Sequence, residues 1–177
     1  MRRHAGWMPT AYFHSIYSID FDLLYRRGFR GLILDIDNTL VPHDAKADRR
    51  AREFMEYVHD LGFDTCFLSN NKRERVLPFA RACRSSFICK AGKPAPRAYY
   101  RAMRRMMTDR TDTLVIGDQI VTDIWGANMA GIPSILLDPI NRHEEFQIVL
   151  KRFLEWPVRA VFRRRYGMNR YESLYAE

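Results

Sequence analysis

The sequence has no long apolar run and few cysteines. No stretch of about 18 consecutive apolar residues occurs, so we expect no membrane-spanning helix. The start of the chain lacks the apolar segment of a secretory signal, and we expect none. The three cysteines, Cys66, Cys83 and Cys89, cannot all pair and show no Cys-x-x-Cys spacing. This pattern is typical of reduced thiols in a cytosolic protein and argues against a zinc site.

Internal repeats, low-complexity tracts and a linker between domains are also absent. With 177 residues, 47% of them hydrophobic, the chain is long enough for one compact domain with its own core. We predict that residues 1–140 form this domain, with residues 1–30 as an N-terminal appendage that contains a helix around 18–28. Residues 141–177 are predicted to form a C-terminal basic amphipathic helix and tail.

Negative charge is outweighed by positive charge, and the net charge is +8. Residues 151–177 hold seven Lys and Arg against three Glu, and the rest of the chain holds 22 against 18. The final segment therefore carries half of the excess. A basic end of this kind favours contact with anionic surfaces such as lipid headgroups or nucleic acid.

Apolar runs of strand length alternate with segments of helical periodicity. The predicted strands are residues 31–36, 63–69, 86–90, 112–118 and 133–138. The predicted helices are residues 46–62, 72–83, 95–107 and 122–131. Such alternation is typical of βαβ units, so we predict an α/β three-layer sandwich around a central, mostly parallel five-stranded sheet.

The most apolar stretch of the chain, "LILDIDNTLV" (32–41), contains two aspartates. Desolvating a carboxylate such as Asp35 is costly unless it has a partner or a function. In parallel sheets, ligands bind beyond the carboxyl ends of the strands. Because Asp35, Ser69 and Asp118 each fall at such an end, we expect them to meet at one edge of the sheet.

Four segments occur in a telling order: "DIDNTLVP", "LSNNKRERV", "GKP" and "GDQIVTDIWGAN". Each alone has an ordinary explanation, such as an Asx-turn, a helix cap or a strand-end turn. Together they resemble the haloacid dehalogenase-like (HAD) phosphatase superfamily, in its small IIIA subgroup, and within that the YqeG-type phosphatases. The resemblance covers roughly residues 9–150 and implies an HAD-like Rossmannoid fold.

The two aspartates of the first segment suit phosphoryl transfer. A carboxylate such as Asp35 can attack phosphorus and form an aspartyl-phosphate. Because residues i and i+2 of a strand share a face, Asp37 can reach the same site, protonate the leaving oxygen and then activate water. The resemblance implies the same roles, with Asp35 as the nucleophile and Asp37 as the acid and base.

Neighbouring carboxylates also need a cation, and a site of hard oxygen ligands suits Mg²⁺. The predicted metal ligands are Asp35, Asp37, Asp118 and Asp123. The resemblance implies that Asp37 contributes its backbone carbonyl.

The predicted phosphate-binding residues are Ser69, Asn70 and Lys93. Ser69 offers a hydroxyl, and the amides after it lie where a helix begins. Lys93 supplies a positive charge that holds the phosphate and balances the carboxylates. Three further basic residues stay open: His43 either faces the site or is a turn residue, and Arg73 and Arg75 either contact an anionic substrate or are solvated.

The spacing of the motifs leaves no room for a lid. Between Asp35 and Ser69 lie 33 residues, and between Ser69 and Lys93 lie 23. A helix and a strand occupy each interval, whereas an inserted cap domain needs about 50 residues or more. We therefore expect an open site, suited to a macromolecule, a lipid headgroup, or a small molecule enclosed by an oligomer partner.

Residues 146–166 combine apolar side chains at helical spacing with Lys and Arg. A basic amphipathic helix of this kind can lie in a membrane interface. It can equally dock on its own domain or on another subunit, while nucleic acid is the least favoured partner.

The resemblance also bears on the substrate. YqeG-type proteins are similar to the mitochondrial phosphatase that converts phosphatidylglycerophosphate to phosphatidylglycerol. We expect a Mg²⁺-dependent phosphomonoester hydrolase for this anionic lipid, cytoplasmic and peripheral at the inner face of the membrane. The alternatives are a phosphatase for a soluble metabolite, a nucleic-acid end or a phosphoprotein, and an RNA- or ribosome-associated binding factor.

Overall fold

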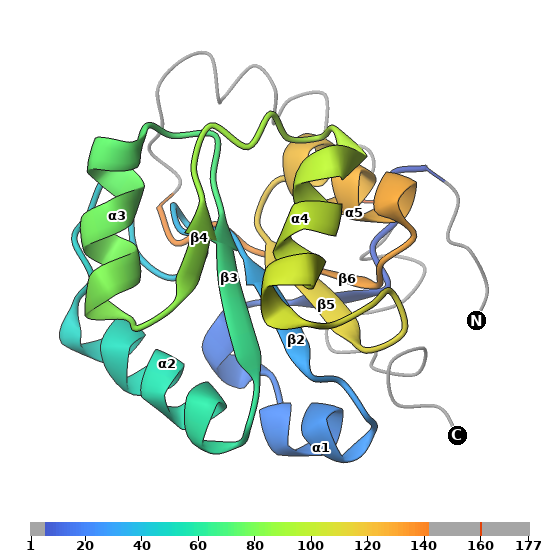
Figure 1. Cartoon of the computed structure of the whole chain (residues 1–177), viewed down its shortest axis with the longest axis horizontal. Helices are drawn as coiled ribbons and strands as arrows, with labels where there is room; N and C mark the ends of the chain where they lie inside the picture. The colour runs from blue at the N-terminus through green and yellow to red at the C-terminus, as the bar shows by residue number, and fades with distance from the viewer. Residues whose placement is uncertain (1–5, 142–159, 161–177) are drawn as a thin grey trace.

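A computed structural model describes residues 6–141 and residue 160, so the predicted amphipathic segment 146–166 lies almost entirely outside the described residues. Six strands form one all-parallel sheet in the order β1-β6-β5-β2-β3-β4 (Figure 1). The strands are β1 (Ala11–Phe13), β2 (Gly31–Leu34), β3 (Asp64–Leu68), β4 (Ser86–Ile88), β5 (Thr113–Gly117) and β6 (Ser134–Leu137).

Helices cover both faces of this sheet. The helices are α1 (Phe21–Arg26), α2 (Arg49–Asp60), α3 (Arg73–Ala82), α4 (Pro96–Met106) and α5 (Trp125–Ala130), with a 3₁₀ turn η1 (Ile16–Ser18) and a π-helical turn η2 (Ile120–Ile124). Helices α1, α2 and α3 pack on one face, and α4 and α5 on the other. The predicted three-layer α/β sandwich is confirmed, and no cap domain interrupts residues 6–141.

The sixth strand, β1, was not predicted. It is only three residues long and pairs with β6, with Ala11 opposite Ile135. A segment this short shows no periodicity, and its partner strand lies more than a hundred residues away. It is recognisable as a strand only by its pairing with β6 in the sheet. Part of the segment 1–30, which the sequence suggests as an appendage, therefore belongs to the sheet.

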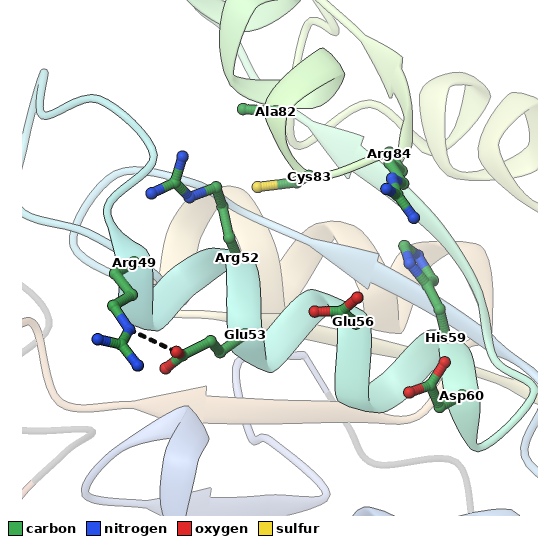
Figure 2. A pocket seen from close by; sticks show the side chains of 9 residues that line it. All are labelled: Arg49, Arg52, Glu53, Glu56, His59, Asp60, Ala82, Cys83 and Arg84. Atoms are coloured by element: carbon green, nitrogen blue, oxygen red, sulfur yellow. Dashed lines mark hydrogen bonds and ion pairs between the residues drawn. The ribbon is translucent and has the colours of Figure 1, made fainter.

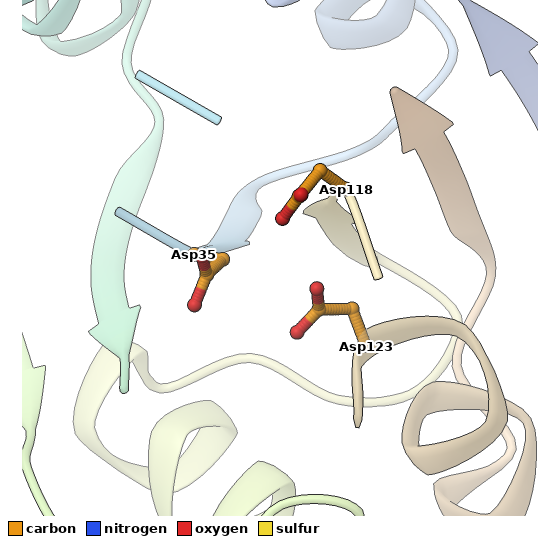
Figure 3. A group of neighbouring side chains, drawn as sticks. All are labelled: Asp35, Asp118 and Asp123. Atoms are coloured by element: carbon orange, nitrogen blue, oxygen red, sulfur yellow. The ribbon is translucent and has the colours of Figure 1, made fainter. Parts of the chain in front are cut away.

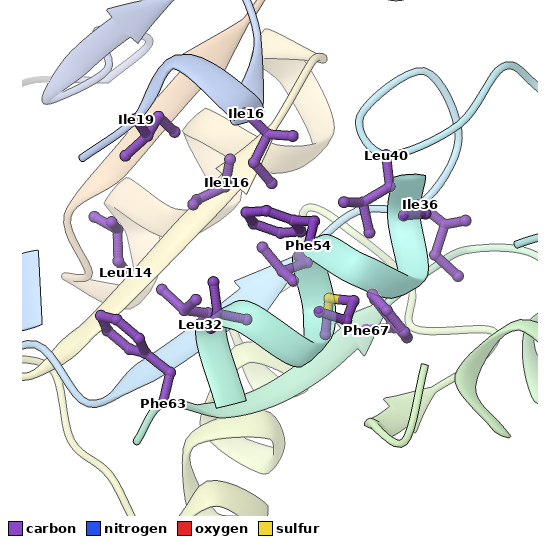
Figure 4. Close-up of a cluster of buried hydrophobic side chains, with 14 of the residues drawn as sticks. Ile16, Ile19, Leu32, Ile36, Leu40, Phe54, Phe63, Phe67, Leu114 and Ile116 are labelled. Atoms are coloured by element: carbon purple, nitrogen blue, oxygen red, sulfur yellow. The ribbon is translucent and has the colours of Figure 1, made fainter. Parts of the chain in front are cut away.

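Alternation along the central strands divides the core into two layers, as successive strand residues point to opposite faces. Leu32 of β2 and Phe67 of β3 lie in the cluster under α1, α2 and α3 (Figure 4). Ile33 and Cys66, their neighbours in sequence, lie in the cluster under α4 and α5. The strands are thus apolar on both faces, which is why they appear in the sequence as unbroken apolar runs.

Two aspartates set where helices begin. The carboxylate of Asp20 accepts a hydrogen bond from the Leu23 N–H at 2.8 Å, and that of Asp48 accepts one from the Ala51 N–H at 2.7 Å. These N-caps start α1 and α2. The cap at Asp48 explains why α2 begins three residues later than the apolar periodicity suggests.

One pocket lies between α2 and the end of α3 (Figure 2). Its lining mixes Arg and acidic side chains with the buried thiol of Cys83, and none of the predicted site residues contributes to it. Among the described residues, no helix has the length and apolarity needed to cross a bilayer.

Replacing Phe67 by alanine tests the core. The ring is fully buried and meets Phe79 edge-on at a centroid distance of 5.3 Å. We expect the free energy of unfolding to fall by about 3–5 kcal/mol, because the change removes transfer energy and leaves a cavity. Urea unfolding measures this, with Met107→Ala, at a side chain 89% exposed, as the control. A loss below about 1 kcal/mol contradicts the assignment of Phe67 to the core.

Candidate active site

The carboxyl ends of three adjacent strands carry the predicted polar residues. Asp35 directly follows β2, Ser69 follows β3 and Asp118 follows β5. Because β5, β2 and β3 are neighbours in one parallel sheet, their ends meet at the same edge. The predicted position of these residues beyond the strand ends is confirmed.

Three carboxylates converge at this edge. One oxygen each of Asp35, Asp118 and Asp123 lies within 4.8 Å of the others (Figure 3), and we call this group the acidic cluster. The Lys93 ammonium bridges two of them, with Nζ 2.5 Å from Asp35 Oδ1 and 2.7 Å from Asp123 Oδ1. Asp118 and Asp123 are almost entirely buried, and the Lys93 side chain is only 5% exposed.

The charges of this group do not balance. Among the described residues, three carboxylates face one ammonium, so full ionisation would leave an excess of two negative charges in a site sheltered from water. Such an excess is costly unless a cation or protons offset it. A set of buried carboxylate oxygens is what a hard divalent ion such as Mg²⁺ binds, so the residues fit that ion.

The pKa of Asp35 reflects this imbalance. Burial raises it, Lys93 lowers it and Asp123 raises it again, for a value of about 7. Burial lowers the pKa of the Lys93 ammonium, but the carboxylates of Asp123 and Asp35 outweigh this, so that it lies above its ordinary value. Lys93 therefore stays charged and partly offsets the effect of burial on the pKa of Asp35.

Asp123 owes its position to the turn that carries it. It lies in η2, a π-helical turn, and not in the regular helix predicted over 122–131. The backbone N–H of Gln119 donates to Asp123 Oδ2 at 3.1 Å. A Cβ at residue 117 would overlap the Asp123 carboxyl group, so only Gly117 allows this approach. Insertions of π-helix are frequent at functional sites.

Asp37 has different partners. Its Oδ1 accepts from Arg75 Nη2 at 2.7 Å and from the Asp44 N–H at 2.9 Å, and its Oδ2 accepts from Asn71 Nδ2 at 2.7 Å. Its carboxylate is therefore not part of the acidic cluster. The backbone carbonyl of Asp37 as a metal ligand stays a prediction.

Of the other two predicted phosphate-binding residues, Asn70 contacts Lys93 directly and Ser69 precedes Asn70 at the end of β3. Both ends of the Asn70 side-chain amide pair with the Lys93 backbone, since Oδ1 accepts from the Lys93 N–H at 2.8 Å and Nδ2 donates to its carbonyl at 3.2 Å. Ser69 is buried, and its hydroxyl accepts from the Asn71 N–H at 3.1 Å. Asn70 thus holds the lysine loop, and its predicted contact with phosphate remains untested.

Sequence reasoning left Arg75 undecided and did not assign Asn71 a role. A basic residue at the start of α3 is indistinguishable by pattern from a solvated helix charge. The contact with Asp37 depends on how α3 is rotated against β2, and no local signal gives that angle. His43 lies 3.6 Å from the exposed Asp44 carboxylate, and Arg73 lies over the Phe87 ring.

Comparisons with known proteins agree with this geometry. A family model described as HAD-hydrolase-like matches residues 90–139. A Bacillus subtilis (strain 168) protein named "Probable phosphatase YqeG" is 34% identical over 160 residues, which cover 90% of this chain and 93% of that protein. The chain is therefore an HAD-type phosphatase, a hydrolase of phosphoric monoesters. Within that class it belongs to the YqeG family.

More distant likenesses reach other proteins. "Phosphatidylglycerophosphate phosphatase 1, chloroplastic/mitochondrial" from Arabidopsis thaliana is 26% identical over 153 residues, 80% of this chain and 44% of that protein. A crystal structure of an uncharacterized protein from Corynebacterium glutamicum is 20% identical and superimposes with a TM-score of 0.53 over 72% of this chain and 93% of that one. The structural likeness supports the fold alone.

The charge excess of the acidic cluster predicts that Asp118→Asn affects the melting temperature differently with and without Mg²⁺. Without the ion, we expect the melting temperature not to fall, because one of three crowded like charges is removed. At a ~100-fold excess over its dissociation constant, Mg²⁺ should raise the wild-type melting temperature by about 5–10 °C and that of the variant by less than half as much.

Differential scanning fluorimetry measures both shifts. Asp64→Asn, at an exposed carboxylate in the first position of β3, is the control and should respond to Mg²⁺ as the wild type does. An equal shift in wild type and Asp118→Asn would show that the acidic cluster does not bind the ion.

Proposed function

We propose that this phosphatase depends on Mg²⁺, works through an aspartyl-phosphate on Asp35, and removes the terminal phosphate of phosphatidylglycerophosphate. The observation that supports it most is the bridge of Lys93 between Asp35 and Asp123, with Asp118 beside them. It joins a carboxylate nucleophile, a fixed positive charge and a set of metal ligands within one strand-end site.

In the first step, a carboxylate oxygen of Asp35 attacks phosphorus in line with the ester oxygen. A P–O bond forms to Asp35 while the P–O bond to the alcohol breaks, and Asp37 gives its proton to the departing oxygen. Lys93 fixes the orientation of the Asp35 carboxylate through Oδ1 and offers positive charge to the phosphoryl oxygens.

In the second step, water attacks the phosphorus of the aspartyl-phosphate. Asp37, now ionised, takes a proton from the water, and the bond between phosphorus and Asp35 breaks. Inorganic phosphate leaves and both carboxylates return to their starting state. The Ser69 hydroxyl donates to a phosphoryl oxygen during both steps, while its oxygen accepts from the Asn71 N–H and is held in place by it.

Asp35, Asp118, Asp123 and the Asp37 carbonyl are the proposed ligands of Mg²⁺. When bound, the ion supplies positive charge to the phosphoryl oxygens and lowers the pKa of Asp35 towards its ordinary value. The excess of carboxylates over the Lys93 ammonium among the described residues supports this role for the ion.

The choice of an anionic lipid headgroup rests on three supports. The described chain has no cap, so the site is open to a bulky substrate. A relative in Arabidopsis is named for this reaction. The sequence of residues 146–166 suits peripheral contact with an anionic membrane at the cytoplasmic face, and this contact is part of the proposal.

Asp35→Asn should reduce kcat for any phosphomonoester by at least ~10³-fold, because an amide cannot act as the nucleophile. Acid-quenched wild type incubated with ³²P-labelled substrate should carry hydroxylamine-sensitive phosphate, and the variant should not. Asp64→Asn is the charge-matched control at the opposite end of the sheet. Turnover that survives Asp35→Asn would exclude the aspartyl-phosphate route.

A substrate panel tests the lipid. Phosphate release from phosphatidylglycerophosphate micelles with Mg²⁺ should have a kcat/KM at least ~10-fold above that for sugar phosphates, phosphorylated RNA ends and a phosphopeptide, because a lidless site gains specificity from the surface around it. A preference for one of the soluble substrates would replace the lipid by that class. Absence of hydrolysis with every substrate would favour a binding factor.

A further inference from the structure

We propose that Arg75 recognises a second anionic group on the leaving alcohol of the substrate and so sets a preference for monoesters whose alcohol also carries a phosphodiester. This inference rests on the proposed function, in which Asp37 lies beside the leaving oxygen. It adds a specificity-determining residue to that site.

The position of Arg75 follows from its contact with Asp37. A general acid must come within about 2.6–3.2 Å of the oxygen it protonates. The guanidinium donates to Asp37 Oδ1 at 2.7 Å through Nη2, so it lies one contact further out on the leaving-group side. An anion carried by the leaving alcohol therefore has this guanidinium within reach.

Exposure increases along the same line. The side chains of Asp35 and Asp37 are 10% and 11% exposed, that of Arg75 is 18% exposed, and that of Asp44 is 72% exposed. Arg75 therefore lies between the largely buried Asp37 and the exposed Asp44, both of which it contacts. We infer that a long alcohol leaves the site on this side.

Arg75 also has donor capacity to spare. Its Nε is buried and has no hydrogen-bond partner, although it lies 3.5 Å from Asp44 Oδ1. A guanidinium has five N–H donors in a planar fork, which suits bidentate contact with a phosphate. Arg75 can therefore keep Asp37 in place with one N–H of Nη2 while its Nε–H and the remaining N–H groups bind the substrate.

Asp44 occupies the place that the substrate anion would take. Its carboxylate lies near both Arg75 and His43, but it is mostly solvent-exposed, and exposed ion pairs contribute little net stability. The Asp37 contact uses the backbone N–H of Asp44, so the side chain can leave without breaking it. Asp44 thus acts as a stand-in anion that a substrate displaces easily.

Lys93 and Arg73 are poorly suited to this role. Lys93 is buried and shared between Asp35 and Asp123. Arg73, two residues before Arg75 on α3, is exposed and lies over the Phe87 ring at 5.4 Å from its centroid. Arg73 therefore provides a control with the same charge on the same helix turn.

The experiment compares two soluble substrates on the full chain with Mg²⁺. One is glycerol 3-phosphate, and the other is the deacylated lipid headgroup, in which one glycerol carries both the phosphomonoester and a phosphodiester. Arg75→Gln should lower kcat/KM for the headgroup at least ~10-fold more than for glycerol 3-phosphate, through KM, because a charge-assisted bidentate contact is lost. Arg73→Gln should leave the ratio of the two values as in the wild type.

Asp44→Asn is a second variant, and its effect on KM is expected to be opposite to that of Arg75→Gln. It removes the competing carboxylate, and asparagine tolerates the positive φ of 58° found at this residue. The KM for the headgroup should fall by about 3-fold or more, with a smaller change for glycerol 3-phosphate. Where Arg75→Gln fails to fold, as judged by its melting temperature, this arm decides the inference.

An equal loss of kcat/KM for both substrates in Arg75→Gln would overturn the inference, because Arg75 would then act only by positioning Asp37. An unchanged KM ratio in Asp44→Asn would overturn it as well. Calorimetric binding of glycerophosphoglycerol, the deacylated diester product, gives a readout independent of turnover. Arg75-dependent binding without hydrolysis of either substrate would refute the proposed function and overturn the preference among monoesters, leaving only recognition of the diester by Arg75.

Discussion

The buried bridge of Lys93 between Asp35 and Asp123 is the interaction on which the site depends. The end of β2 and the turn before α5 bring two acidic side chains together, and the Lys93 ammonium, from the loop after β4, offsets their repulsion. Its backbone is held in turn by the Asn70 amide, which follows β3. Lys93 therefore links four segments of the chain. A change in any of them alters the surroundings of the proposed nucleophile.

Electrostatics divides the site into two halves. On the side of Asp35, the described carboxylates outnumber the positive groups, so this half suits the binding of a cation. On the side of Asp37, an arginine and an asparagine satisfy both carboxylate oxygens. The first half suits attack on a phosphoryl group held among cations, and the second suits contact with a leaving alcohol. Two aspartates only two residues apart in the sequence thus acquire different chemistry from their neighbours.

The sequence is sufficient to predict most of this arrangement, because strand ends are local features. Apolar runs locate β2 and β5, and the parallel sheet then brings Asp35 and Asp118 together. The features that the sequence cannot predict are those that depend on tertiary packing. Strand β1 exists only through its pairing with β6, and η2 forms where Gly117 lets the Asp123 carboxylate approach. The contact between Arg75 and Asp37 requires the rotation of α3 against the sheet.

The absence of a cap from the described chain changes where specificity must come from. In a capped enzyme, a second domain surrounds the leaving group, whereas none covers the proposed nucleophile in the described chain. Discrimination between alcohols must then use the few side chains beside Asp35 and Asp37. One of these is the Arg75 guanidinium, which contacts Asp37 and lies near the exposed carboxylate of Asp44. Such a guanidinium favours a second negative charge on the alcohol. This charge distinguishes a phospholipid headgroup from the phosphomonoester of an otherwise uncharged alcohol.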